Sequence, residues 1–212
     1  MRCFTISLIL VVSMASKASD SSVFGTLVDE VFDSIGTGNT VVEYKHYLVT
    51  GLTAEDLHKA TSTDSPLRDD DNPKIGYAAI TALIPGNNKH SIVPNANGKY
   101  VFGGVEINQK IVITLPKWEV RTGAKQCLID QWDAAMIALR KHEDHHRSKY
   151  EEIEPNLIAK AKLISPKDTE QEFLVELKKV YKEVQEQIFA YQKNYDKITK
   201  RGINEGVVWN PC

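Results

Sequence analysis

The stretch from Leu128 to His146, LIDQWDAAMIALRKHEDHH, carries the strongest structural pattern in the chain. Its apolar residues recur every three or four positions, which predicts an amphipathic helix with one face buried in a core. Two histidines continue this face, and the stripe consists of Leu128, Trp132, Ala135, Leu139, His142 and His146. We therefore expect the histidines to face inward, because a charged surface patch would place them on the polar side with Arg140, Lys141 and Asp144.

Within this stretch, His142, Glu143 and His146 fit the pattern H-E-x-x-H. On a helix the i, i+4 spacing places both imidazoles on one face, one turn apart, where they can bind one metal ion. A Zn²⁺ ion held by neutral nitrogens lowers the pKa of its water, and a neighbouring carboxylate such as Glu143 can remove the proton. The other interpretation is a solvated charged patch that spells the pattern by chance, and the pattern alone does not separate the two.

The other four histidines are interpreted as structural or exposed side chains rather than as ligands. His145 lies three residues after His142 and leans to the flank of the pair, so we expect it to be a bystander. His46, His58 and His90 belong to the half of the chain that is predicted to form a sheet.

Composition and charge restrict the class of protein. A chain of 212 residues with 42% hydrophobic residues has enough apolar side chains for the core of one ordinary domain. The formal net charge of -2 shows no basic excess of the kind that binds phosphate backbones or anionic lipid surfaces. We therefore expect no nucleic acid partner.

The first 18 residues are predicted to form a secretory signal peptide. Arg2 precedes an apolar run from Phe4 to Met14, and small residues lead to Ala18, after which cleavage is expected. A membrane anchor is the weaker interpretation, because this run is too short to span about 30 Å of hydrocarbon. The mature chain is therefore expected to be a secreted or periplasmic protein that does not insert into a membrane after the signal is removed.

Cys127 and Cys212 remain after the signal peptide, and they are predicted to form a disulfide in an oxidising compartment. The bond would join the C-terminal tail to the start of the histidine-bearing helix and close a loop of 212 − 127 = 85 residues. Two unpaired thiols are the alternative, because a sequence alone does not prove connectivity.

Strand-like patterns occupy the first half of the mature chain. Residues 41–50 are rich in β-branched and aromatic side chains, and residues 76–84 and 100–116 form two more predicted strands. A turn-rich segment, residues 85–99, separates these two strands. Residues 69–71 are three aspartates in a polar loop, interpreted as a solvated acidic turn because the ligand spacing of a known calcium loop is missing.

Helical patterns lie on both sides of these strands. The segment Phe24–Ile35 predicts a short amphipathic helix, and Thr53 with Asp56 predicts a capping box at the start of another helix. After Gly123 the chain predicts two long packed helices, the first of them kinked or broken near Pro155.

These elements predict an α+β fold in which a small antiparallel sheet packs against two long C-terminal helices. The expected organisation is a signal peptide over residues 1–18, an N-terminal segment with the short helix over residues 19–40, and one main domain over residues 41–212. No internal repeat or low-complexity segment interrupts this order.

Five segments resemble a known family in their order and spacing, and they are YLVTGLTAEDL, GYAAITAL, VEINQKIVITLPKW, WDAAMIALRKHEDHHR and NYDKITKRGINEGVVW. The family is a bacterial domain family of unknown function that is described as predicted secreted zinc-dependent proteases. The resemblance runs from about Tyr44 to Trp209 and implies a zincin-like metallopeptidase domain that binds Zn²⁺ and acts on peptide or protein substrates. It also implies that His142 and His146 bind the metal and that Glu143 is the catalytic carboxylate.

The chain departs from the family pattern in its last segment, where the family carries a histidine before a glycine and this chain has Arg201 before Gly202. Arginine stays protonated and cannot replace a histidine ligand. Asp196 and Glu205 lie close by in the sequence, but a solvated or salt-bridged acid is the more frequent role of such residues. The third ligand is therefore unassigned by the sequence.

Two functional classes follow from these observations. The first is a secreted zinc-dependent metalloprotease in which Glu143 is the general base for zinc-activated water. The second is a non-catalytic secreted binding or scaffold domain with a degenerate metal site. The intact residues His142, Glu143 and His146 favour the first class, and metal analysis of the purified protein distinguishes the two.

Overall fold

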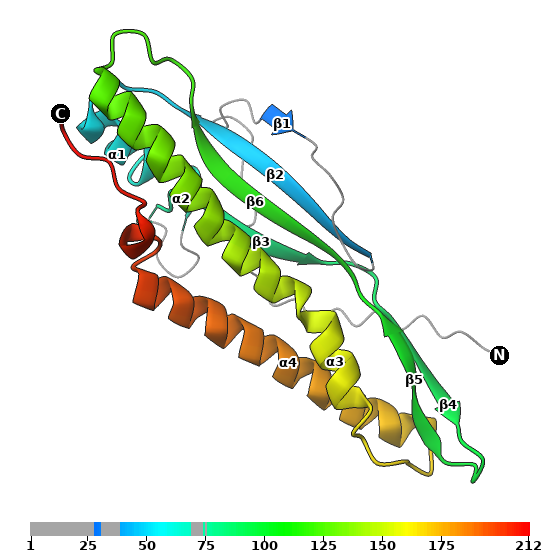
Figure 1. The fold of residues 1–212 in the computed structure, drawn as a ribbon. Coiled ribbons are helices and arrows are strands. Elements are labelled where there is room, and N and C mark those ends of the chain that lie inside the picture. Colours follow the sequence, from blue (N-terminus) through cyan, green and yellow to red (C-terminus); the bar gives the residue numbers. More distant parts are fainter. Residues whose placement is uncertain (1–27, 31–38, 69–73, 75) are drawn as a thin grey trace.

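The computed structural model of the chain describes residues 28–30, 39–68, 74 and 76–212. It is an elongated α+β fold in which one long helix lies along a four-stranded sheet and a second long helix crosses beside it (Figure 1). The strands are β1 (Val28–Glu30), β2 (Asn39–Val49), β3 (Ile80–Pro85), β4 (Lys89–Pro94), β5 (Tyr100–Glu106) and β6 (Asn108–Trp118). The helices are α1 (Ala54–Thr61), α2 (Gln126–Glu151), α3 (Ile153–Ala161), α4 (Glu170–Thr199) and the 3-10 helix η1 (Ile203–Glu205). The predicted α+β class is therefore confirmed.

The strand order β1–β2–β6–β3 places β2 and β6 in the centre of the sheet. These two strands are parallel, from Asn39 opposite Asn108 to Val49 opposite Trp118, whereas β1 and β3 are antiparallel to their neighbours. The expectation of an antiparallel sheet is therefore wrong for the central pair. Parallel neighbours need a long crossover, and α1, β3 and the β4–β5 hairpin supply it between β2 and β6.

The predicted single strand over residues 100–116 is two strands, because β5 pairs with β4 in a separate hairpin and β6 belongs to the main sheet. Ile107 separates them, with 1% of its surface exposed, and it packs in a second apolar cluster with Leu157 and Phe173. The inward-facing alternation continues through Ile107 while the backbone changes its pairing partner, so the periodicity does not reveal the change. The predicted turn over residues 85–99 also contains β4 and narrows to a turn at residues 95–99.

Val28–Glu30 form the strand β1, which corrects the helix predicted over Phe24–Ile35. Their backbone pairs with residues 44–46 of β2, so pairing to a sheet edge overrides the helical periodicity at these positions. The rest of that predicted helix, the signal peptide over residues 1–18 and the acidic turn over residues 69–71 lie outside the described residues. Within the described ranges, no helix combines the length and the apolar character needed to cross a bilayer.

The main core lies between the sheet and the apolar stripe of α2. Leu128, Trp132, Ala135 and Leu139 are all 3% exposed or less, as the periodicity predicted. The ring of Trp132 meets Trp118 of β6 at 5.6 Å and Trp209 of the C-terminal tail at 5.0 Å between centroids. Burial of each large apolar side chain contributes about 1.5–3 kcal/mol to stability, so this stripe determines how α2 is rotated on the sheet.

Two further local predictions are confirmed. The helix break falls where it was expected, because α2 ends at Glu151 and α3 begins at Ile153. Pro155 occupies the first turn of α3, where its missing N–H leaves no helical hydrogen bond unmade. At the start of α1, Thr53 and Asp56 form the predicted capping box.

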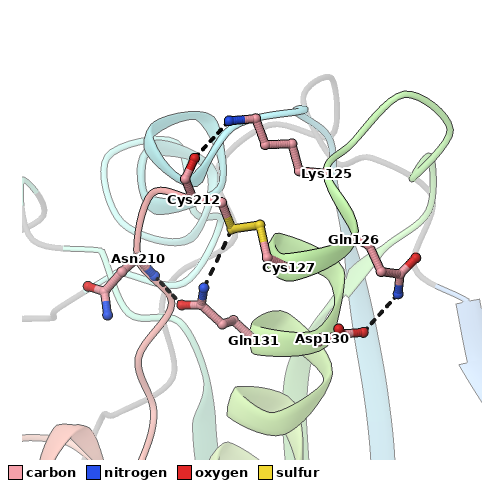
Figure 2. Close-up of a disulfide and its surroundings, with 7 residues drawn as sticks. All are labelled: Lys125, Gln126, Cys127, Asp130, Gln131, Asn210 and Cys212. Carbon is pink, nitrogen blue, oxygen red and sulfur yellow. Dashed lines mark hydrogen bonds between the residues drawn. A yellow bond between two sulfur atoms is a disulfide. The ribbon is translucent and has the colours of Figure 1, made fainter.

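The C-terminal tail is tied to the start of α2 by the predicted disulfide between Cys127 and Cys212, whose Cα atoms are 6.2 Å apart. Figure 2 shows three hydrogen bonds of this tail, one of them from Gln131 Nε2 to Cys212 Sγ at 3.5 Å. Lys125 Nζ donates to the carbonyl of Cys212 at 2.7 Å, and the backbone N–H of Asn210 donates to Gln131 Oε1 at 2.8 Å. The tail therefore runs along α2 in a defined register.

We predict that the double variant Cys127→Ser/Cys212→Ser loses about 4–5 kcal/mol of unfolding free energy, because the bond closes an 85-residue loop in the unfolded chain. Urea unfolding followed by tryptophan fluorescence measures the loss. The reduced parent protein is the control and should unfold at the same urea concentration as the double variant. Equal midpoints for the oxidised parent and the double variant would contradict the prediction.

Candidate metal centre

The buried face of α2 continues from its apolar residues into three ionisable side chains. His142 and His146 are 2% and 7% exposed, as their position in the stripe predicted, and Glu143 beside them is 5% exposed. The histidine rings lie one turn apart, with centroids 4.8 Å from each other and ring planes nearly perpendicular. The H-E-x-x-H segment is therefore part of the protein interior and not a solvated charged patch.

Asp196 of α4 lies against both histidines. Its Oδ1 is 3.2 Å from His142 Nε2 and 3.0 Å from His146 Nε2, and the two Nε2 atoms are 3.2 Å apart. Three potential ligand atoms thus surround one point. The side chain of Asp196 is 42% exposed, so solvent reaches the cluster from the α4 side.

The partners of the Nδ1 atoms determine which tautomer each histidine adopts. Glu205 Oε2 lies 2.7 Å from His142 Nδ1, and an ionised carboxylate only accepts hydrogen bonds, so this Nδ1 carries the proton. Gln192 Nε2 donates to the carbonyl of His146 at 2.8 Å, which turns Gln192 Oε1 toward His146 Nδ1 at 2.6 Å. This amide oxygen likewise requires a proton on Nδ1. In the neutral imidazoles both Nε2 atoms are therefore bare acceptors.

Two acceptor nitrogens and a carboxylate oxygen that converge without a donor repel one another, so either a proton or a cation is needed between them. The separations of 3.0–3.2 Å match the edge of a tetrahedral zinc site, which is about 3.3 Å for ligand bonds near 2.0 Å. Histidine Nδ1 groups that donate to a carboxylate and to an amide oxygen are the usual supports of zinc-binding imidazoles. The donor set therefore fits Zn²⁺.

The pKa values of the cluster show that the histidines, when protonated, attract the ionised Asp196. Burial is the largest single influence and lowers the pKa of His142 and of His146. The hydrogen bonds to Asp196, Glu205 and Gln192, together with the charges of Glu143 and Asp196, outweigh it and raise both pKa values above 6.5. Burial would raise the pKa of Asp196, yet the two histidines hold it well below 3.8. The carboxylate of Asp196 thus favours the protonated form of both histidines.

Glu143 contacts the sheet. Its Oε2 accepts a hydrogen bond from Thr81 Oγ1 of β3 at 2.7 Å. Burial raises the pKa of Glu143 above 4.5, although the Thr81 hydrogen bond and the charges of His146 and His142 act in the opposite direction. This carboxyl is thus a stronger base than an exposed glutamate.

The turn after α4 places Glu205 on His142. Lys200, Arg201 and Gly202 have φ angles of 51°, 55° and 84°, so three successive residues adopt the left-handed conformation. A Cβ at Gly202 would lie 2.6 Å from Val207 Cγ2 and 3.4 Å from the ring of His142, so glycine allows the turn to pack flat on that ring. Tyr195 also donates to Glu205, from Oη to Oε1 at 2.7 Å.

The remaining sequence candidates lie outside the cluster. His145 stacks on Tyr195, with centroids 4.0 Å apart, and its Nε2 lies 2.8 Å from Tyr191 Oη, as expected of a bystander. Among the described residues, the group that can hold a metal consists of His142, His146 and Asp196, and it does not include His46, His58 or His90. Arg201, which stands where the family pattern was expected to carry a histidine, lies over the ring of Tyr77 instead.

Thr81, Gln192 and Tyr195 support the site but were not predicted as functional. A signal for Gln192 exists, because it follows the buried Ile188 by four residues on α4 and precedes Asp196 by four. These positions extend an apolar stripe with polar side chains, as the histidines do on α2. For Thr81 the sequence carries no such signal, since only the packing of α2 on β3 brings it to Glu143.

The α+β fold with two histidines and an aspartate converging between two helices defines a protein with a candidate metal centre. The chain belongs to the family described as bacterial protein of unknown function (DUF922), whose model matches residues 44–202 of the 212. This match confirms the resemblance to a bacterial family of unknown function that the sequence segments indicated. No curated protein and no solved structure matches the chain.

We predict that Gln192→Leu lowers zinc affinity 10- to 100-fold while keeping all three ligand atoms, because it removes the acceptor that orients His146. Competition with a chromophoric chelator measures the affinity. The matched control is Gln187→Leu, an exposed glutamine one helical turn and a half earlier on α4, which should bind zinc as the parent does. Equal affinities for both variants and the parent would contradict the assigned role of Gln192.

We predict that the thermal stabilisation by added zinc grows from about pH 6 to about pH 8. The folded-state pKa values of His142 and His146 are raised, so their protons stabilise the metal-free fold below pH 6.5, and this contribution is lost as pH rises through those values. Zinc replaces the protons, and its advantage increases as they leave. Melting curves with and without zinc test this, and a zinc effect that is independent of pH would contradict it.

Proposed function

We propose that this protein is an exported, zincin-like, zinc-dependent metallopeptidase. The observation that carries the proposal is the convergence of His142 Nε2, His146 Nε2 and Asp196 Oδ1 within 3.2 Å of one another, next to the buried carboxylate of Glu143. This combination pairs a three-ligand zinc set with a neighbouring general base, which is the minimum that metal-assisted hydrolysis requires.

Each residue has a distinct role in the proposed reaction. His142, His146 and Asp196 hold the ion, and zinc supplies the Lewis acidity that acidifies water and polarises a carbonyl group. Glu143 accepts the proton of the attacking water and delivers it to the leaving amine. Thr81 binds Oε2 of this carboxylate, while Oε1 has no hydrogen-bond partner in the described part of the chain and is the oxygen that can face the water.

The raised pKa of Glu143 supports its role as the base. A general base works best when its pKa approaches the operating pH, and burial moves the pKa of this carboxyl in that direction. Its hydrogen bond to Thr81 keeps the side chain oriented and stabilises the ionised form. Burial thus strengthens the base, while the hydrogen bond to Thr81 keeps it oriented.

The edge of the sheet supplies a surface for the peptide. β3 is the last strand in the order of the described sheet, so one of its backbone edges is available for pairing. An extended peptide adds readily to such an edge through main-chain hydrogen bonds. Because Thr81 of β3 contacts Glu143, a peptide on this edge is carried past the base and the metal cluster.

The non-catalytic alternative depended on a missing third ligand. Asp196 Oδ1 is a candidate third ligand atom, because it lies 3.2 Å from His142 Nε2 and 3.0 Å from His146 Nε2. This observation favours the catalytic interpretation. The disulfide between Cys127 and Cys212 supports export, because such bonds persist in oxidising compartments and are rare in the cytosol.

We predict that Glu143→Gln retains zinc but lowers the rate of peptide cleavage by about 10²–10⁴, because the amide cannot accept the proton. His142→Ala should lose zinc and activity together, since one of three ligands is gone. Zinc content and the rate of a chelator-sensitive cleavage of a peptide library are measured for each variant.

His145→Ala is the matched control, because it removes a histidine from the same helical turn that does not join the cluster. It should keep both zinc and activity near the parent level. Cleavage by Glu143→Gln at the parent rate would refute the mechanism even in a zinc protein. A parent that binds zinc but cleaves no peptide would support the non-catalytic alternative.

A further inference from the structure

Arg201 is an exposed cation beside the candidate site that has no acidic partner in the described part of the chain. Its guanidinium lies 4.5 Å from the ring centre of Tyr77, a distance typical of a cation–π contact. The backbone of Tyr77 is anchored, because its N–H donates to the carbonyl of Leu67 at 3.0 Å and its own carbonyl accepts from Ser65 Oγ at 2.6 Å. The contact therefore keeps a positive charge at one defined place.

The backbone also holds Arg201 in position. Its N–H donates to the carbonyl of Asp196 at 2.8 Å, which links it directly to the residue that completes the metal cluster. Its φ angle of 55° is unfavourable for a residue with a side chain, and such conformations persist where the surroundings enforce them, often at functional sites. The guanidinium therefore extends from the end of α4 to the segment that leads into β3.

The direction of β3 determines which end of a peptide paired with this strand comes near the guanidinium of Arg201. Tyr77 lies before β3, which starts at Ile80 and contacts Glu143 through Thr81. A peptide that pairs antiparallel with β3, the more stable arrangement, runs toward Tyr77 with its C-terminal end. Thr81 and Tyr77 are separated by at most about 13 Å of extended chain, so this end meets Arg201 within about four residues of the cleaved bond.

We propose that Arg201 is a specificity-determining residue that binds a carboxylate of the substrate on the C-terminal side of the cleaved bond. The carboxylate belongs either to the end of a short peptide or to an acidic side chain, since both offer the planar pair of oxygens that a guanidinium binds in bidentate form. The inference rests on the proposed peptidase function and names the class of peptide that the site selects. A parallel peptide would bring its amino end to Arg201 and would be repelled.

The experiment uses peptides of one sequence in three forms, namely a free C-terminal carboxylate, a C-terminal amide, and the amide with one aspartate up to four residues after the cleaved bond. The zinc-loaded parent should cleave a carboxylate-bearing form with at least about tenfold higher kcat/KM than the plain amide, the effect of one charge-assisted pair. Which of the two carboxylate forms shows the effect identifies the source of the recognised group. The proposal is overturned if neither form is preferred.

Arg201→Asn should abolish this preference and leave zinc content and cleavage of the plain amide near the parent level. Asparagine tolerates a positive φ, so the variant keeps the turn. Lys200→Asn is the matched control, because it removes the adjacent cation at a φ of 51° and should retain the preference. Arg201→Asp should reverse it toward peptides with a lysine after the cleaved bond. Equal effects of the variants at positions 200 and 201 would contradict a specific role for Arg201.

Binding of the same peptides to zinc-loaded Glu143→Gln, measured by calorimetry, separates this inference from the proposed function. A carboxylate preference in binding that disappears with Arg201→Asn, in a parent that cleaves nothing, would refute the peptidase function and keep the peptide contact of Arg201. Cleavage without a carboxylate preference would refute the contact and keep the function. If the peptides are neither cleaved nor bound, both proposals are wrong.

Discussion

The packing of one face of α2 against the sheet is the interaction on which the rest of the protein depends. The same stripe supplies Trp132, the most deeply buried tryptophan of the described residues, and both histidines of the candidate metal centre. Side chains on a helix keep a constant angular relation, so burial of the apolar half determines where His142 and His146 point. It also directs Glu143 toward β3, where Thr81 meets it. The hydrophobic core therefore orients the chemical groups.

The candidate centre brings the polar side chains of His142, His146 and Asp196 close together at the buried face of α2. Converging acceptor atoms in a buried place cost stability unless a proton or a metal ion separates them. A second layer of partners limits this cost, since Glu205 and Gln192 bind the outer nitrogens of the two histidines. The tail that carries Glu205 is anchored at its end by the disulfide to α2, so the outer layer is supported from outside the site as well. Buried ionisable side chains that are held in place by further hydrogen bonds in this way are typical of functional sites.

Local patterns predicted what depends on local physics. The helix break near Pro155, the capping box of Thr53 and the burial of the α2 stripe follow from proline geometry, hydrogen-bond capping and 3.6-residue periodicity, and the structure has all three. Which strands pair with one another was harder to predict. The alternation that predicts a strand carries no information about its neighbour, so the parallel β2–β6 pair and the division at Ile107 did not follow from the pattern.

The sequence by itself determined the two histidines and the glutamate of the site, because their spacing within a single helix sets their geometry without any other element. It also determined the α+β class and the cysteine pair. Only the tertiary structure decided between Asp196 and Glu205. Both acids lie near the end of α4, yet Asp196 Oδ1 reaches the Nε2 atoms while Glu205 binds Nδ1 of His142 from the outer side. The packing of α4 beside α2 and the left-handed turn after α4 make that choice. The contacts of both acids with His142 join residues more than fifty positions apart in the chain, so local patterns do not reveal them.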